Sequence, residues 1–192
     1  DPLADADVVE TELMLADLES LEKRVSQIEK KAKTGDKDAK AQFAVMEKPL
    51  LLLREGKPAR LAKMTPEEMP TFRALQLLTS KPIVYVCNVE ESAAAHGNAY
   101  SKQVEERAKA EGAAVVIISA KIESEFSGLA AEDRDAFLGE MGLEEPGLNR
   151  LIRAGYELLD LVTYFTVGPK EARAWTITRG TKAPQAAAVI HT

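Results

Sequence analysis

Two short, uninterrupted apolar runs constrain the fold of this chain more than any other feature. Residues 83–87 and 113–118 are rich in β-branched side chains and match the length of a strand. A helix-length segment at residues 100–110 separates them, and Gly112 closes that segment. Continuous apolar strands joined by a helical crossover are typical of a parallel sheet that is covered on both faces. We therefore predict an α/β fold with a β-α-β unit.

Two amphipathic helices are predicted to precede this unit. In residues 6–33 the apolar positions alternate between steps of four and three, which is the a/d stripe of a heptad repeat. A break at 34–36 is followed by a second striped helix, in which Pro49 is expected to cause a kink. The stripes consist of Met14, Leu18, Leu21, Val25 and Ile28, then Phe43, Met46, Leu50 and Leu53. They can cover each other as an antiparallel coiled-coil arm; a helical packing element of another kind is the alternative.

Weaker patterns predict the remaining elements. The run from Thr65 to Glu68 combines a cap, a proline and two acids, so a helix is expected from there to Leu78. Further helices are predicted at 131–141, 147–160 and 186–190, and strands at 161–167 and 172–178. Because a two-stranded hairpin is marginally stable alone, these last strands are expected to open a further small domain.

Composition narrows the class of protein. The 192 residues are 45% hydrophobic and carry a formal net charge of -6, which argues against a chain-wide electrostatic grip on nucleic acid. The single cysteine, Cys87, cannot form an intramolecular disulfide. No apolar run approaches the roughly 20 residues of a membrane span, and the N-terminus shows no signal-peptide pattern. We expect a cytoplasmic protein without a membrane partner.

Polar residues at the ends of the two strands form the candidate binding site. Asn88 and Glu91 follow the first strand, and Ser119, Ala120 and Lys121 follow the second. Ligands of parallel sheets bind beyond the carboxyl ends of the strands. The Asn88 side chain can brace the two loops, and the Glu91 carboxylate can accept hydrogen bonds from a nucleobase. The backbone of the second loop can offer donors, and the Lys121 stem can cover the ring, so the pattern predicts a purine slot.

Each of these residues also has a plain structural interpretation. Asn88 can be a strand-end turn residue, and Glu91 an acid at a helix start. Ser119 can be a helix cap, and Lys121 a solvated charge. The occurrence of both patterns on consecutive strand ends favours the binding site.

Other reactive side chains are weaker candidates. Cys87 lies in a predicted buried strand, which disfavours a catalytic thiol. His96 and His191 are too few and too scattered for a metal site. Trp175 fits a core or hairpin-face position better than base stacking. Two interpretations remain open for Arg173, Arg179 and Lys182: they form a small basic patch, or they belong to a solvated face.

Several stretches resemble the YchF (Obg-like ATPase) family of P-loop proteins. Residues 81–91 (KPIVYVCNVEE) are similar to the family's fourth guanine-nucleotide motif, and residues 118–123 (ISAKIE) to its fifth. The runs 147–156 (GLNRLIRAGY) and 164–177 (YFTVGPKEARAWTI) resemble the same family. Residues 12–19 resemble its inserted helical domain, so the resemblance covers nearly the whole chain.

The resemblance implies a detailed fold and domain plan. It implies part of a P-loop GTPase-like parallel sheet with an inserted α-helical coiled-coil hairpin and the start of a β-grasp (TGS) domain. Residues 1–78 would be the helical arm, 79–160 the C-terminal part of the nucleotide-binding (G) domain, and 161–192 the truncated start of the TGS domain. In the family, the TGS domain is associated with RNA or ribosome contacts.

The chain departs from the family pattern in its phosphate site. No G-x-x-x-x-G-K-[ST] and no D-x-x-G occurs in the sequence. The family carries both motifs before the helical insertion, so the resemblance places the phosphate and Mg²⁺ site of the intact protein upstream of Asp1. We interpret the chain as a fragment that does not hydrolyse nucleotide alone.

Two substitutions bear on the choice of base. GTPases carry Asn-Lys-x-Asp at the fourth motif, whereas here Val89 replaces the lysine and Glu91 the aspartate. Guanine is therefore expected to be favoured less, and the resemblance implies ATP, often in preference to GTP. The predicted nucleotide-binding residues, none of them catalytic or metal-binding, are Asn88, Val89, Glu91, Ser119, Ala120 and Lys121.

Two functions are compatible with these patterns. In the first, the parent protein binds and hydrolyses ATP or GTP and has a ribosome-associated or regulatory role. In the alternative, the chain is part of a non-enzymatic module that binds ribosome, RNA or protein.

Overall fold

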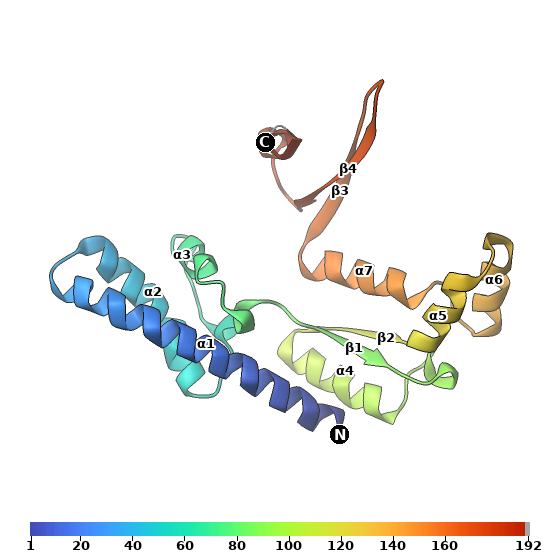
Figure 1. Ribbon diagram of the computed structural model, residues 1–192, viewed down its shortest axis with the longest axis horizontal. Coiled ribbons are helices and arrows are strands. Elements are labelled where there is room, and N and C mark those ends of the chain that lie inside the picture. Colours follow the sequence, from blue (N-terminus) through green and yellow to red (C-terminus); the bar gives the residue numbers. More distant parts are fainter. Residues whose placement is uncertain (191–192) are drawn as a thin grey trace. The chain divides into compact units, whose positions relative to one another are not determined.

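A computed structural model describes residues 1–190 of the chain (Figure 1). These residues divide into two compact units, Asp1–Pro82 and Ile83 onward. The architecture is α/β: a helical hairpin fills the first unit, and the second holds two small sheets with their helices.

The first unit is built on two long antiparallel helices, α1 (Pro2–Lys33) and α2 (Lys37–Arg54). Asp1 caps α1, which therefore begins four residues earlier than the stripe predicts. The Asp36 carboxylate accepts from the N–H groups of Asp38 and Ala39 and so starts α2. Helix α2 runs through Pro49, whose ring is buried.

Both predicted stripes pack into one apolar cluster of the first unit. Its buried members include Leu21, Val25, Met46, Leu50 and Leu53, and Met14, Leu18, Ile28 and Phe43 pack against it. Phe72, Leu75 and Leu77 come from the segment after α2 and complete the cluster. Burial of these side chains supplies the main stabilisation of the hairpin.

The helix predicted from Thr65 to Leu78 is much shorter in the structure. Helix α3 covers only Met69–Ala74, and short 3-10 turns occupy Ala59–Leu61 (η1) and Leu78–Ser80 (η2). Helix α3 begins at Met69 because Pro70 is then accommodated in its first turn, where no N–H is required. Gln76 has a φ of 55°, which takes the backbone out of the helical region before Leu78.

A buried aspartate joins α1 to η2. Asp17 is 3% exposed and accepts hydrogen bonds from the backbone N–H of Leu78 (2.7 Å), the N–H of Thr79 (2.8 Å) and the Thr79 hydroxyl (2.7 Å). The Thr79 oxygen in turn accepts from the N–H of Ala59 at 3.0 Å. Both carboxylate oxygens of this buried side chain thereby accept hydrogen bonds, as a stable interior requires.

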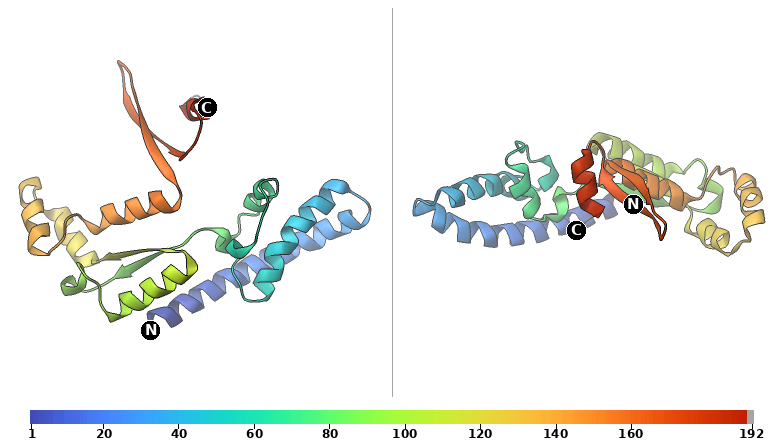
Figure 2. Two further views of the ribbon diagram at one scale, coloured as in Figure 1. Left: turned by 180° about the vertical axis from the view of Figure 1, so that it is seen from behind. Right: turned by 90° about the horizontal axis from the view of Figure 1, so that it is seen from above.

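The second unit contains the predicted β-α-β arrangement. Strands β1 (Val84–Asn88) and β2 (Ala114–Ile118) pair in parallel, with helix α4 (Ala99–Glu111) as the crossover. Asn98 forms a capping box at the start of α4, and Gly112 ends it at a φ of 69°, where a side chain would be strained. Helix α4 covers one face of the sheet and α7 (Gly147–Leu158) the other (Figures 1 and 2).

The segment between β2 and α7 holds one helix that the sequence patterns do not predict. Helix α5 (Ala120–Gly128) follows β2 directly, and α6 (Ala131–Glu140) matches the predicted helix at 131–141. Ile122 of α5 is 1% exposed and packs with Ala94, Leu138 and Leu143 in a second apolar cluster. This cluster fixes α5 at the carboxyl end of β2.

The C-terminal residues form an antiparallel hairpin and a helix. Strand β3 (Leu161–Val167) pairs with β4 (Ala172–Thr178), and α8 (Ala183–Ile190) follows. The Arg173 guanidinium lies over the Trp175 ring at 4.1 Å, so these two side chains share one face of β4.

Candidate functional site

The candidate site is the pair of loops at the carboxyl ends of β1 and β2. Asn88 ends β1 and is the register partner of Ile118, the last residue of β2. The N–H of Val89 donates to the carbonyl of Ile118 at 2.8 Å, so backbone pairing between the two strands continues to the residues where the loops begin. The two loop ends are therefore side by side.

A side chain of one loop binds the backbone of the other. The Oδ1 atom of Asn88 accepts from the N–H of Ala120 at 2.9 Å. Ala120 begins α5, and the first N–H groups of a helix have no intrahelical acceptor. The Asn88 amide thus caps the helix from the neighbouring loop and brings the two strand ends into a fixed relation.

This bond changes one detail of the predicted slot. The sequence suggests that the backbone of 119–121 can donate to a base, but the Ala120 N–H is already directed at Asn88. Ser119 occupies the N-cap position of α5 without a side-chain cap bond, and only 3% of the residue is exposed. Donation to a ligand from this loop would have to come from later in the first turn of α5.

An ion pair also joins the side chains of the two loops. The Lys121 ammonium donates to Glu91 Oε2 at 2.8 Å, with the Lys121 side chain 66% and the Glu91 side chain 38% exposed. The hydrogen bond and the charge of Glu91 raise the pKa of Lys121 above its ordinary value. Because exposed ion pairs contribute little free energy, a ligand can rearrange this one at small cost.

Two residues between Asn88 and Glu91 complete the first loop. Val89 is buried, with 9% of its surface exposed. The Glu90 carboxylate accepts from Asn98 Nδ2 at 3.4 Å and so faces the start of α4. The structure thus brings together all six predicted residues: Asn88, Val89, Glu91, Ser119, Ala120 and Lys121.

Two positioning residues were not among the predicted site residues. The Glu123 carboxylate accepts from the N–H groups of Gly147 (2.6 Å) and Leu148 (3.2 Å), which links α5 to the start of α7. A Cβ atom at Gly147 would lie 2.8 Å from Ile118 Cγ2, so only glycine allows this close approach. A glycine at the first position of a predicted helix is the available signal, but the partner of Glu123 cannot be read from the sequence.

The other candidate residues lie elsewhere. Cys87 lies on β1, and burial together with the charge of Glu105 raises the pKa of its thiol, so the thiol is protonated at neutral pH. Within residues 1–190, no group of three His, Cys, Asp or Glu side chains is arranged to hold a metal ion. His191 lies outside the described residues. No helix in the described part of the chain is long and apolar enough to span a membrane.

The fold and loops define an α/β protein with a β-α-β unit, a helical hairpin and braced polar loops at the strand ends. Comparison with known proteins shows which family the chain is similar to. The chain is 51% identical to the "Ribosome-binding ATPase YchF" of Escherichia coli O157:H7, over 100% of the chain and 52% of that protein. The corresponding identity to the YchF of Bacillus subtilis is 45%, over 100% of the chain and 53% of the relative. Over its full length the chain is therefore similar to proteins of the YchF family, which confirms the resemblance of its motifs.

A solved structure and a family match agree with this assignment. The structure described as "Structure of the Schizosaccharomyces pombe YchF GTPase" matches with a TM-score of 0.85 and 31% identity, over 100% of this chain and 53% of that one. Residues 161–192 match the family YchF-GTPase_C, described as a protein of unknown function (DUF933). The chain spans about half the length of the relatives it matches.

Proposed function

We propose that this chain supplies the base-recognising end of a nucleotide-binding protein that, when intact, hydrolyses ATP. The observation that carries the proposal is the bond from the Ala120 N–H to Asn88 Oδ1, at 2.9 Å. It joins the two strand-end loops through protein groups alone, so the recognising groups need little ordering when a base arrives. Preorganised loops at this end of a parallel sheet suit a nucleotide.

Each predicted residue has a role in this proposal. Asn88 is a brace, and Ala120 and Ser119 are the helix start that it holds. Glu91 is the acceptor for a base amino group, and Lys121, which pairs with it at 2.8 Å, covers the ring with its aliphatic stem. Val89 provides apolar surface against the base.

Glu91 and Val89 also support a preference for adenine. A carboxylate one methylene longer than the aspartate of GTPases is placed differently from the two adjacent donors of guanine, and an unpaired donor weakens binding. Relatives from E. coli and B. subtilis are named ATPases, whereas the S. pombe structure is described as a GTPase. We assign ATP as the principal nucleotide and GTP as the weaker one.

Hydrolysis belongs to the intact protein in this proposal. The 192 residues contain no phosphate-binding loop, and the described carboxylates form no cluster suited to Mg²⁺. When bound, Mg²⁺ would neutralise charge on the phosphates, and its ligands would come from the rest of the intact protein. The contribution of this chain is to bind and orient the base.

The proposed function includes a role for each of three parts of the chain: a coiled-coil arm, part of a G domain and a TGS domain. Heptad packing of α1 on α2 supports a coiled-coil arm at 1–78, followed by the G-domain part at 79–160. The β3–β4 hairpin followed by α8 is a suitable opening for a β-grasp (TGS) domain at 161–192. The relatives' name, "Ribosome-binding ATPase YchF", supports a ribosome-associated role. We assign the ribosome contacts to the arm and the TGS domain and place the protein in the cytoplasm.

Calorimetry on the intact protein tests the proposal. Glu91→Ala should weaken ATP binding by roughly tenfold or more, because a base amino group loses its charged acceptor. Glu90→Ala is the matched control, since that adjacent carboxylate faces Asn98, and it should leave affinity nearly unchanged. Equal ATP affinity in the wild type and Glu91→Ala would reject the assigned site. Absence of binding by both nucleotides to the wild type would favour the non-enzymatic module.

A further inference from the structure

The outer edge of strand β2 is open. Within residues 1–190, β2 pairs with a strand on one side only, which is β1. Bonds from Ala114 N to Ile83 O and from Val89 N to Ile118 O set the alternation of the parallel ladder. That alternation directs the backbone N–H and C=O groups of Val115 and Ile117 away from β1. Such groups are a template for another strand.

A cavity of about 350 Å³ follows this edge. Its floor includes three consecutive strand residues, Val115, Val116 and Ile117. Its walls come from α4 and α7, which cover opposite faces of the sheet (Figures 1 and 2). The other lining residues are Glu105 on α4, Glu145 shortly before α7, and Arg150, Arg153, Ala154 and Glu157 on α7. An extended segment between the two helices would therefore meet the free backbone groups.

Arg150 lines this cavity and also a second one, beside Gly142 and Leu143. Its Nε and Nη2 atoms are buried and have no hydrogen-bond partner among the described residues. These two atoms form one side of the guanidinium fork, so their N–H groups point at a common acceptor region. Buried donors without a partner are costly, so a ligand that supplies a carbonyl oxygen there is favoured.

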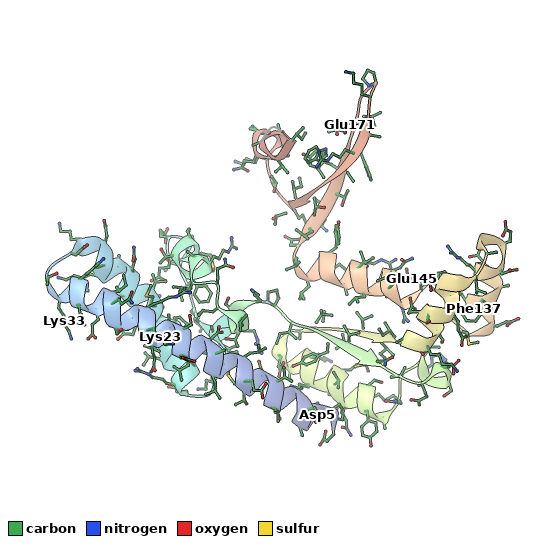
Figure 3. All side chains as sticks on the ribbon, in the orientation of Figure 1. Asp5, Lys23, Lys33, Phe137, Glu145 and Glu171 are labelled. Carbon is green, nitrogen blue, oxygen red and sulfur yellow. The ribbon has the colours of Figure 1, made fainter. Side chains whose placement is uncertain are left out.

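One acidic group that lines the cavity is already paired with an arginine. Glu145, labelled in Figure 3, accepts from both terminal nitrogens of Arg153 at 2.7 Å each. This bidentate pair is electrically balanced. Beside Arg150, the cavity then keeps the carboxylates of Glu105 and Glu157, both on exposed residues. The rim is acidic overall, which disfavours an anionic ligand and favours basic side chains.

We propose that the edge of β2 binds an extended, basic peptide segment of a partner protein, which adds as a third strand. The backbone of the peptide pairs with Val115 and Ile117, and one of its carbonyls accepts from Arg150. Its lysine or arginine side chains lie near Glu105 and Glu157. This mode of recognition takes affinity from main-chain hydrogen bonds and selectivity from alternate side chains. It does not depend on the nucleotide site.

Fluorescence anisotropy with peptide probes tests this proposal on the full chain. The probe is a labelled peptide of about eight residues that alternates valine and lysine, a length that spans a typical strand. Saturable binding is expected. The same peptide N-methylated at every residue loses the backbone donors of both edges and should not bind. A valine–glutamate peptide should bind at least about tenfold more weakly. Equal binding by the N-methylated probe, or tighter binding by the acidic probe, would overturn the proposal.

Two variants locate the site. Val115→Pro removes an outward N–H without removing a bond to β1, a position where proline is tolerated. Arg150→Gln removes the paired donors. Each variant should bind the valine–lysine probe roughly tenfold or more weakly than the wild type does. Arg153→Gln, on the same helix, should not weaken it, because that guanidinium is bound by Glu145.

Circular dichroism verifies that each variant is folded. If Val115→Pro unfolds, the test rests on probe binding by Arg150→Gln. Unchanged probe binding by the folded variants would contradict the proposal. A dimer in light scattering that Val115→Pro abolishes would also contradict it, because a second copy would then occupy the edge.

Discussion

The Lys121 ammonium donates to the Glu91 carboxylate at 2.8 Å and so joins the loops that follow the two parallel strands. The residues are thirty positions apart in sequence, and the register of β1 and β2 brings them together. The bond lies at the exposed mouth of the proposed base slot. It is a contact that a bound base would have to share or replace.

Removing the Glu91 charge should lower the pKa of Lys121. The hydrogen bond and charge of Glu91 hold this pKa above the ordinary value of 10.5. In Glu91→Gln, the NMR titration of the Lys121 ε-protons should shift to lower pH. A raised folded-state pKa means that the pair stabilises the fold below pH 10.5 and that this effect disappears as pH rises through the folded-state value. An unshifted titration in the variant would show that the pair does not form in solution.

Gly147→Ala should destabilise the second unit. The new methyl group would lie 2.8 Å from Ile118 Cγ2 and 2.9 Å from Glu123 Oε1, so α7 must move away from the sheet. We expect a loss of about 1–3 kcal/mol in the free energy of unfolding. Gly155→Ala is the matched control on the same helix, where nothing lies within 4 Å. It should be neutral or stabilising by about 0.5–1 kcal/mol. Urea unfolding measures both, and similar losses would refute the close-approach explanation.

Asp17→Ala should destabilise the helical hairpin. The change leaves two buried N–H groups and the Thr79 hydroxyl without their acceptor. Loss of charge-assisted bonds in a buried position should cost about 3 kcal/mol in urea unfolding. Asp5→Asn, on the same helix with its side chain 84% exposed, should change stability by less than about 0.5 kcal/mol. A small effect at Asp17 would mean that water or another group replaces the carboxylate.

The heptad stripe can be tested by truncating one buried leucine. Leu21 is fully buried, so Leu21→Ala should cost about 2–5 kcal/mol through lost burial and the cavity that remains. Leu15, on the same helix, is 59% exposed, and Leu15→Ala should have a small effect. Thermal unfolding of the two variants should differ clearly. Equal melting temperatures would contradict the observed packing.

Periodicity predicted the long-range elements because it reports burial directly. The apolar runs at 83–87 and 113–118 identified the parallel pair, and the steps of three and four identified the hairpin and its core residues. Helix α5 was missed because its only fully buried apolar residue is Ile122 and because it begins inside the loop pattern at Ala120. A single buried position carries no period.

Most polar contacts between segments that are distant in the chain could not be predicted from the sequence. Asp17 lies on a charged helix and reads as a surface residue, since the donors that its carboxylate binds are 61 and 62 positions away. The same holds for Glu123, which caps α7 from 24 positions away. The bracing role of Asn88 could be predicted, because both its loop and that of Ala120 follow strands of one parallel pair.

The most direct measurement of the central claim is the position of the adenine ring when ATP is bound to the intact protein. Nuclear Overhauser effects should connect the adenine H2 and H8 protons to the Val89 methyl groups and the Lys121 side-chain methylenes. They should be absent in an Asn88→Ala protein that remains folded. Strong effects from adenine to other residues, with none to Val89 or Lys121, would contradict the assignment of this slot.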